Sequence, residues 1–123
     1  SEITVTGDIS VTANSTVDQG FRLYGSPVFK STGGNITINA STTASNYGVL
    51  LDSSSQIKTD DGNIDITASS AGSYYGLALA SSSVIEAQGS GSTVKITAVG
   101  AGTGGGIWMN DSSKILSTGN INI

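Results

Sequence analysis

Residues 62–88, GNIDITASSAGSYYGLALASSSVIEAQ, nearly repeat the stretch that precedes them. Residues 34–60 read GNITINASTTASNYGVLLDSSSQIKTD, and residues 119–123 start the pattern once more with GNINI. Self-similarity at a period of roughly 20–50 residues is the sequence signature of repeat architectures. The fold of this chain therefore depends on what one repeat can form and on how successive repeats can stack.

Three short units recur along the chain. The first is an Ile/Val-x-Ile/Val triplet, and its first residues are Ile9, Ile36, Ile64, Val94 and Ile121, at steps of 27, 28, 30 and 27. The second is a glycine followed by apolar-x-apolar, in residues 20–23, 48–51, 76–79 and 106–109. The third is one apolar residue nine positions after that glycine: Phe29, Ile57, Ile85 and Ile115. The constant interval indicates that each repeat has the same geometry.

Each unit alternates apolar and polar residues, which is the period of a half-buried strand. The connecting segments are rich in Gly, Ser, Asn and Thr, as turns are, and no stretch has sustained helical spacing. A propeller blade needs four strands and about 40 residues or more, and hairpins would not produce identical triplets at a fixed period. The sequence therefore predicts an all-β fold, a right-handed parallel β-helix of about four coils of 27–30 residues, with three short strands per coil.

This architecture predicts which side chains fill the tube. One wall is Ile9, Val11, Ile36, Ile38, Ile64, Ile66, Val94 and Ile96; the second is Phe21, Leu23, Val49, Leu51, Leu77, Leu79, Ile107 and Met109; the third is Phe29, Ile57, Ile85 and Ile115. Small inward residues at a narrowing corner are Ala13, Ala40, Ala68 and Ala98. Gly-Asn pairs such as Gly34-Asn35 and Gly62-Asn63 predict sharp corners with positive φ, where Asn side chains form a ladder. The two extra residues in segment 89–92 predict a small bulge.

The two ends of the chain match each other. SEITVTGDISV at the start aligns with SKILSTGNINI at the finish, so the chain is expected to enter at a third strand and to leave after a first strand. Solenoids usually end in polar capping repeats, and neither end has that character. We therefore expect residues 1–123 to be a single β-helix segment, an uncapped part of a longer solenoid, whose open edges allow end-to-end self-association.

Composition excludes several classes of function. The net charge is −4 and the chain has only five basic residues, so it lacks the basic patch that binding to nucleic acid requires. There is no Cys for disulfides or thiolate metal sites, and no apolar run near the roughly 18 residues of a membrane span. Carbohydrate-active β-helix enzymes need clustered carboxylates, basic residues or His, and this chain has no His. The chain is therefore not expected to be an enzyme.

Two segments are candidate ligand sites. The acidic pair Asp60-Asp61, with Asp65 nearby, is either a Ca²⁺ ligand set or two solvated turn residues before a glycine corner, and the second interpretation is favoured because no pattern recurs in adjacent coils. The Gly-rich segment 102–111, GTGGGIWMND, lacks both the Ca²⁺-binding nonapeptide repeat and the Gly-Lys-Ser/Thr ending of a phosphate loop. It is interpreted as a flexible connector, and no cofactor is expected.

The aromatic residues indicate a special wall. Tyr47 and Tyr75 precede the glycine of the second strand in consecutive coils, so they are predicted to stack, with Tyr74 beside them. Trp108 is predicted to face outward in one column with Arg22, Leu50 and Ala78, which makes this wall unusually apolar for a solvent face. The wall either stacks on sugars or docks a partner, or it is an aromatic ladder that stiffens the solenoid. The predicted interaction face is Tyr47, Leu50, Tyr74, Tyr75 and Trp108.

Strings such as GNITINA and NYGVLLDSSSQIKTDDGNIDITA resemble the β-helical repeats of large bacterial surface and secreted proteins, of which the filamentous haemagglutinin-like adhesins are the nearest family. The resemblance covers essentially the whole chain. It implies an extracellular or cell-surface location and a role as a stiff stalk for adhesion, biofilm or cell contact. The implied partners are neighbouring coils or domains of the same large protein, and a host or bacterial surface glycan or protein. The alternatives are a carbohydrate-binding β-helix, with cleavage less expected than binding, and a self-assembling fibre subunit.

Overall fold

A computed structural model describes all residues, 1–123, and contains fourteen β-strands and no helix. The strands form three sheets, which we call A, B and C. Sheet A contains β1 (Glu2–Val5), β4 (Val28–Ser31), β7 (Gln56–Thr59), β10 (Val84–Ala87) and β13 (Lys114–Ser117). Sheet B contains β2 (Ile9–Ser15), β5 (Ile36–Thr42), β8 (Ile64–Ser70), β11 (Val94–Gly100) and β14 (Ile121–Asn122). Sheet C contains β3 (Phe21–Leu23), β6 (Val49–Leu51), β9 (Leu77–Leu79) and β12 (Ile107–Met109).

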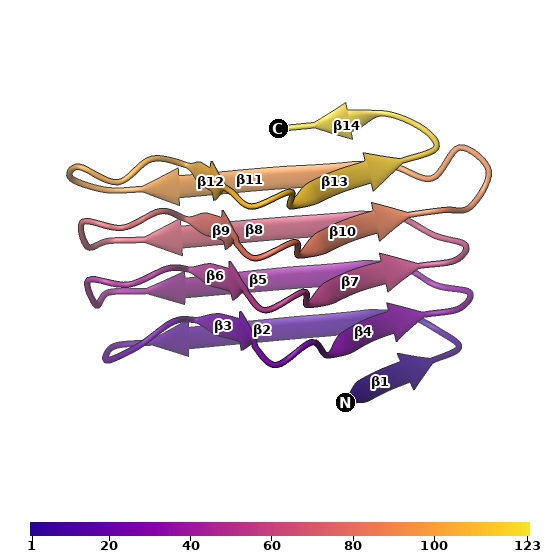
Figure 1. Ribbon diagram of the computed structural model, residues 1–123, viewed down its shortest axis with the longest axis horizontal. Helices are drawn as coiled ribbons and strands as arrows, with labels where there is room; N and C mark the ends of the chain where they lie inside the picture. Colours follow the sequence, from indigo (N-terminus) through magenta and orange to yellow (C-terminus); the bar gives the residue numbers. More distant parts are fainter.

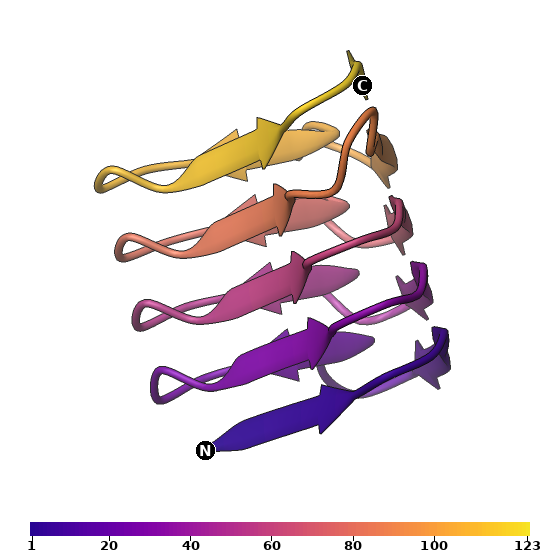
Figure 2. The same ribbon diagram turned by 90° about the vertical axis from the view of Figure 1, so that its right-hand side faces the viewer.

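Each strand pairs in parallel with its counterpart one coil later, so the three sheets are the walls of a β-solenoid of about four turns (Figures 1 and 2). The register is the one that the repeat predicts: Ile36 pairs with Ile64, and Ile38 pairs with Ile66. In Figure 1 the chain runs to the right along the near face and to the left along the far face while it rises from the N-terminus. That path is a right-handed coil, and the predicted right-handed parallel β-helix is confirmed.

The core is a continuous stack of aliphatic side chains inside this tube. The predicted wall residues of the two middle coils are almost wholly buried: Ile36, Ile38, Val49, Leu51, Ile57, Ile64, Ile66, Leu77, Leu79 and Ile85. Ala40 and Ala68 are buried with them, at the predicted narrow corner between sheets B and C. Burial of each large aliphatic side chain contributes roughly 1.5–3 kcal/mol, so this stack is the main stabilising element.

The Gly-Asn corners between sheets A and B form the predicted ladder. The Asn63 backbone N–H donates to the side-chain Oδ1 of Asn35, and the Thr93 N–H donates to Oδ1 of Asn63, each at 2.8 Å. The Asn35 N–H makes the same bond to Oδ1 of Asp8. Each side chain thus satisfies a backbone donor of the neighbouring coil, where the chain leaves one sheet for the next.

The prediction of positive φ at these Gly-Asn corners is wrong. Positive φ occurs instead at the corners between sheets C and A, at Gly25, Ser26, Ser53, Ser54, Ser81, Ser82, Asp111 and Ser112. The left-handed conformation is costly for serine, but here it is repeated in every coil and supported by bonds between coils. The Ser54 N–H donates to the carbonyl of Ser81 at 2.8 Å, and the Ser82 hydroxyl donates to the carbonyl of Asp111 at 2.9 Å.

The glycines that recur in each repeat are explained by the close approach of backbones and not by positive φ. A Cβ on Gly48 would lie 2.6 Å from the backbone N of Ser69 in the next coil, and one on Gly62 would lie 2.6 Å from the carbonyl carbon of Gly34. Real Cβ atoms essentially never approach so closely. At these positions glycine permits sheets and coils to pack at the spacing that the core requires.

Hydroxyls at the ends of three sheet A strands, β4, β7 and β13, connect neighbouring coils. Ser31 Oγ donates to the carbonyl of Gly7 at 2.6 Å, and Thr59 Oγ1 donates to the carbonyl of Gly34 at 2.7 Å. Ser117 Oγ makes the corresponding bond to the carbonyl of Ser92. In the third coil the same place is held by buried alanine, Ala87, which has no hydroxyl. That coil is also the one with two extra residues.

The predicted bulge in the third coil is confirmed. Residues 89–92 form a turn in which the Ser92 N–H donates to the carbonyl of Gly89 at 3.0 Å, with Gly91 at a φ of 70°. In Figure 1 this turn is the loop that projects beyond the others between β10 and β11. The turn absorbs the insertion, and the register of β11 on β8 is unchanged. No helix is present that is long and apolar enough to cross a membrane.

Candidate functional site

The outer side of sheet C carries the predicted aromatic residues. Trp108 pairs in register with Ala78, Ala78 with Leu50, and Leu50 with Arg22, so the predicted column is confirmed. Tyr47 immediately precedes Gly48, where the chain enters β6, and Tyr74 and Tyr75 precede β9 in the same way. We call the four residues Tyr47, Tyr74, Tyr75 and Trp108 the aromatic wall.

The rings of the aromatic wall pack in two pairs that differ from the predicted one. Tyr47 and Tyr74 meet edge to face, with ring centroids 5.1 Å apart and an interplanar angle of 80°. Tyr75 stacks on Trp108, with centroids 6.3 Å apart and an interplanar angle of 30°. The predicted stack of Tyr47 on Tyr75 is therefore wrong, because each ring turns toward a partner on a neighbouring coil. Both observed pairs have geometries that aromatic rings favour.

The middle of the column is covered rather than open to solvent. Leu50 is only 8% exposed and Ala78 is 0% exposed, although both occupy the outward position of their strands. The prediction that Leu50 and Ala78 face solvent is wrong in this respect. Trp108 lies beside Ala78 in the same column, and Tyr75 stacks on Trp108, so we infer that aromatic rings cover the middle of the column. Leu50 therefore supports the wall from beneath.

A carboxylate and two more phenols lie close to the Tyr47 hydroxyl. Burial raises the pKa of Tyr47, and the nearby Tyr74, Tyr75 and Asp52 raise it further, because each disfavours a phenolate beside it. All side-chain hydrogen bonds in the structure are made by Ser, Thr, Asn, Asp, Glu and Gln. The tyrosine hydroxyls and the Trp108 indole N–H therefore have no partner within the protein.

One residue after each sheet C strand begins the corner that leads to sheet A. These residues are Tyr24, Asp52, Ala80 and Asn110, which follow β3, β6, β9 and β12. The Oδ1 atom of Asn110 is shielded from solvent and has no hydrogen-bond partner. At the first coil Arg22 lies over the ring of Tyr24, 4.7 Å from its centroid, which is a cation–π contact. Neither feature is predictable from the repeat, because each depends on a side chain that occurs at its repeat position in one coil only.

The Gly-rich segment packs against the aromatic wall. A Cβ on Gly105 would lie 3.1 Å from Cε1 of Tyr75, and one on Gly104 would clash with the backbone of Tyr74. The absence of side chains in residues 104–105 thus lets the connector of the fourth coil approach the tyrosines of the third. Residues 102–106 thus support the wall in addition to connecting β11 to β12. Residues 107–109 of the same segment form β12, so the interpretation of the whole segment 102–111 as a connector is wrong for that part.

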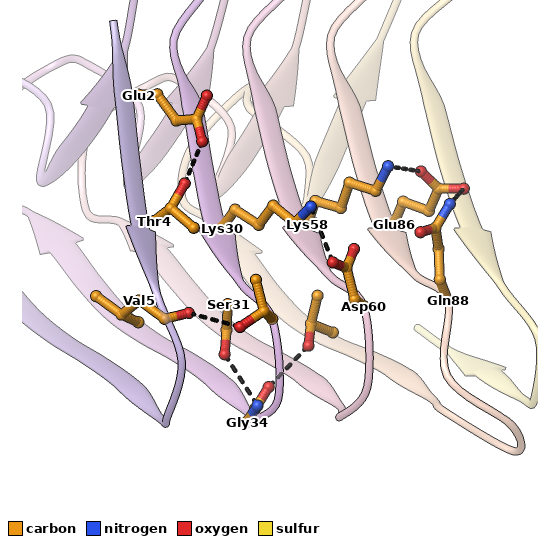
Figure 3. Close-up of polar contacts among 12 residues, drawn as sticks. Glu2, Thr4, Val5, Lys30, Ser31, Gly34, Lys58, Asp60, Glu86 and Gln88 are labelled. Atoms are coloured by element: carbon orange, nitrogen blue, oxygen red, sulfur yellow. Dashed lines mark hydrogen bonds and ion pairs between the residues drawn. The ribbon is translucent and has the colours of Figure 1, made fainter.

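The outer side of sheet A carries the two ion pairs of the molecule (Figure 3). Lys30 Nζ lies 2.8 Å from a carboxylate oxygen of Asp60, and Lys58 Nζ lies 3.7 Å from one of Glu86. Gln88 also donates to Glu86, at 3.1 Å. Both ion pairs join neighbouring coils, so Asp60 of the predicted acidic pair has a structural partner. Asp61 instead lies beside the bulge, next to Gly89.

The chain has no group of three or more His, Cys, Asp or Glu side chains that could hold a metal ion, and its surface has no pocket. The place with the most distinctive chemistry is therefore the aromatic wall on sheet C. No protein-family model, curated protein or solved structure matches this chain. Its function has to be argued from the geometry of the walls and of their connections.

Proposed function

We propose that the chain is a stalk segment of a large extracellular bacterial adhesin or surface fibre, of the filamentous haemagglutinin-like kind. In this role it holds a contact site at a fixed distance from the cell. The observation that carries the proposal is the uninterrupted connection between coils. Parallel ladders in all three sheets, the Asn ladder and the shared apolar core all run along one axis.

The lateral surface supports the same proposal. Only 11% of residues are charged, and the longest strands, β2, β5, β8 and β11 of sheet B, present mainly Ser, Thr and Asn outward. Every Lys and Arg of the chain lies inside a strand: Arg22, Lys30, Lys58, Lys95 and Lys114. A protease that cleaves after basic residues needs locally unfolded chain, so these sites are protected while the ladders remain formed. Such protection suits a rod that is exposed to secreted proteases.

Force spectroscopy tests the mechanical role. A stalk pulled from its two ends should resist force well above the level at which an unfolded chain stretches, and it should then release coil by coil. Each coil of 27–30 residues should release about 100 Å of chain, since an extended residue spans at most about 3.3–3.6 Å. The natural control is a Gly62→Ala variant, which disturbs the contact between two interior coils. A chain that extends smoothly at low force, with or without this substitution, would contradict the proposal.

A further inference from the structure

We propose that the aromatic wall binds a neutral, flat polysaccharide of the β-1,4-linked type, which lies across the coils of sheet C and stacks its sugar rings on Trp108 and Tyr74. This inference is independent of the stalk role, because a rod without any ligand would serve as a stalk equally well. It rests on the exposure of the rings, on their unpaired polar groups, on local charge and on the absence of a cleft.

The rings are accessible, and neighbouring groups hold them in place. Tyr74 is 42% exposed, and Tyr47, Tyr75 and Trp108 are partly exposed. Each ring contacts another ring across coils, and Gly105 packs against Tyr75 from the side. A rigid aromatic surface loses little conformational entropy on binding, which favours affinity for a ligand that stacks on it.

Polar groups that make no bond within the protein lie among these rings. The hydroxyls of Tyr47, Tyr74 and Tyr75 and the indole N–H of Trp108 make no hydrogen bond within the protein. A sugar carries hydroxyls around an apolar C–H face, so it can stack on the rings and pair with these groups at the same time.

The charges favour a neutral ligand. The only basic residue of the column, Arg22, lies against Tyr24 at the first coil, and the Asp52 carboxylate lies near Tyr47. The chain as a whole has a net charge of −4. An anionic ligand would meet repulsion here and no free cation. Strand addition by a peptide is blocked at β6 and β9, which are each paired on both sides, so only β3 and β12 keep an open edge.

The flat surface favours a polymer. Small ligands are usually held in clefts that cover about 70–90% of their surface, and this chain has no pocket. An extended chain gains its contact area from several coils, and flat β-1,4-linked sugars present successive faces to one plane. The ring pairs lie on successive coils, so one such chain can contact both.

The single tryptophan of the chain makes a direct test available. Trp108 emission is titrated with cellohexaose and with chitohexaose, and a saturable change in emission is expected with at least one of them. Tyr74→Ala should weaken the affinity roughly 2- to 10-fold, which is the range for one aromatic contact. Leu116→Ala, which removes an exposed apolar side chain on sheet A, should leave the affinity unchanged.

A second measurement keeps the test independent of the tryptophan signal. Affinity electrophoresis in a gel that contains hydroxyethylcellulose should retard the native chain and Trp108→Phe, and should not retard Trp108→Ala, with circular dichroism confirming that each variant is folded. The proposal is overturned if neither hexasaccharide changes the emission of Trp108. Equal losses from Tyr74→Ala and Leu116→Ala, or tighter binding of an anionic alginate hexasaccharide, would overturn it as well.

Discussion

Gly62 lies directly against Gly34 of the preceding coil: a Cβ on Gly62 would be 2.6 Å from the carbonyl carbon of Gly34 and closer still to its oxygen. Gly7 occupies the corresponding position in the first coil, and nothing lies within 4 Å of where its Cβ would be. The same residue type in the same repeat position is therefore required in one coil and free in another. The difference depends only on whether another coil packs against it.

This contrast predicts different effects of one substitution at two positions. Gly62→Ala should lower the free energy of unfolding by roughly 1–3 kcal/mol, because the added methyl group forces two backbones apart. Gly7→Ala should leave it unchanged or raise it by up to about 1 kcal/mol, because alanine restricts the unfolded chain. Urea denaturation followed by circular dichroism measures both. Equal stability of the two variants would show that the coils are not packed at this spacing.

The missing hydroxyl at Ala87 predicts a stabilising substitution. The Thr59 hydroxyl donates to the carbonyl of Gly34, which lies 25 residues earlier in the chain. The residue 25 positions before Ala87 is Gly62, so the Gly62 carbonyl is the equivalent acceptor. Ala87→Ser should donate to this carbonyl and raise the free energy of unfolding by about 0.5–1.5 kcal/mol. Thr59→Val is the matched opposite: it keeps the shape but leaves the Gly34 carbonyl unpaired, and should lower stability by about 1–3 kcal/mol. A destabilised Ala87→Ser variant would rule out the proposed bond.

The column of charges on sheet A predicts a salt-dependent effect. Glu86→Lys removes the partner of Lys58 and places a third cation in line with Lys58 and Lys30. It should cost about 0.5–1 kcal/mol of stability in low salt, and less in 1 M salt, where charges are screened beyond about 3 Å. Glu86→Gln, which only removes the pair, should have the smaller effect. A loss for Glu86→Lys that does not change with salt would point to packing instead of charge.

The raised pKa of Tyr47 predicts a loss of stability in alkali. In the unfolded chain a tyrosine ionises near pH 10, but in the folded chain burial keeps Tyr47 neutral to higher pH. The contribution of Tyr47 to stability is therefore fully present below about pH 10 and is lost as the pH rises through its folded pKa. Absorbance at alkaline pH should show one of the four tyrosines titrating last. Tyr47→Phe should remove that last step, and the step should persist in Tyr24→Phe.

The placement of basic residues predicts the order of tryptic cleavage. Lys58 lies in β7, which is paired on both sides, by β4 and β10, whereas Lys114 lies in β13, which is paired on one side only. Opening of β13 therefore breaks fewer bonds, and mass spectrometry should detect cleavage after Lys114 well before cleavage after Lys58. Ala87→Ser should slow cleavage after Lys58. Early cleavage at Lys58 in the native protein would contradict the assigned ladders.

The repeat predicted everything that depends on register. Positions that match in sequence, such as Ile38 and Ile66, are paired in space, because a solenoid places equivalent residues of successive coils on top of one another. The Asn35 ladder followed for the same reason. The core and the path of the backbone were therefore accessible from the sequence alone.

Features that depend on local side-chain packing were not accessible. The left-handed Ser53 and Ser54 were missed because two serines are no signature of positive φ, and glycines nearby were the better candidates. Equivalence in sequence aligns the backbones of Tyr47 and Tyr75, but it does not determine in which direction their rings turn. Burial of Leu50 was missed because alternation along a strand says which face a residue occupies and not what covers that face.

The corner at Asn35 and Asn63 has an evolutionary consequence. Each coil offers its neighbour nearly the same donors and acceptors that it receives. An in-frame duplication of one repeat of about 28 codons would therefore add a complete coil without disturbing the pairing of the others. Such an event would lengthen the molecule by about 4.8 Å, whereas gain or loss of a few codons within a strand would break every pairing at that level. Length in this kind of protein can therefore change in discrete steps through ordinary recombination between its own repeats.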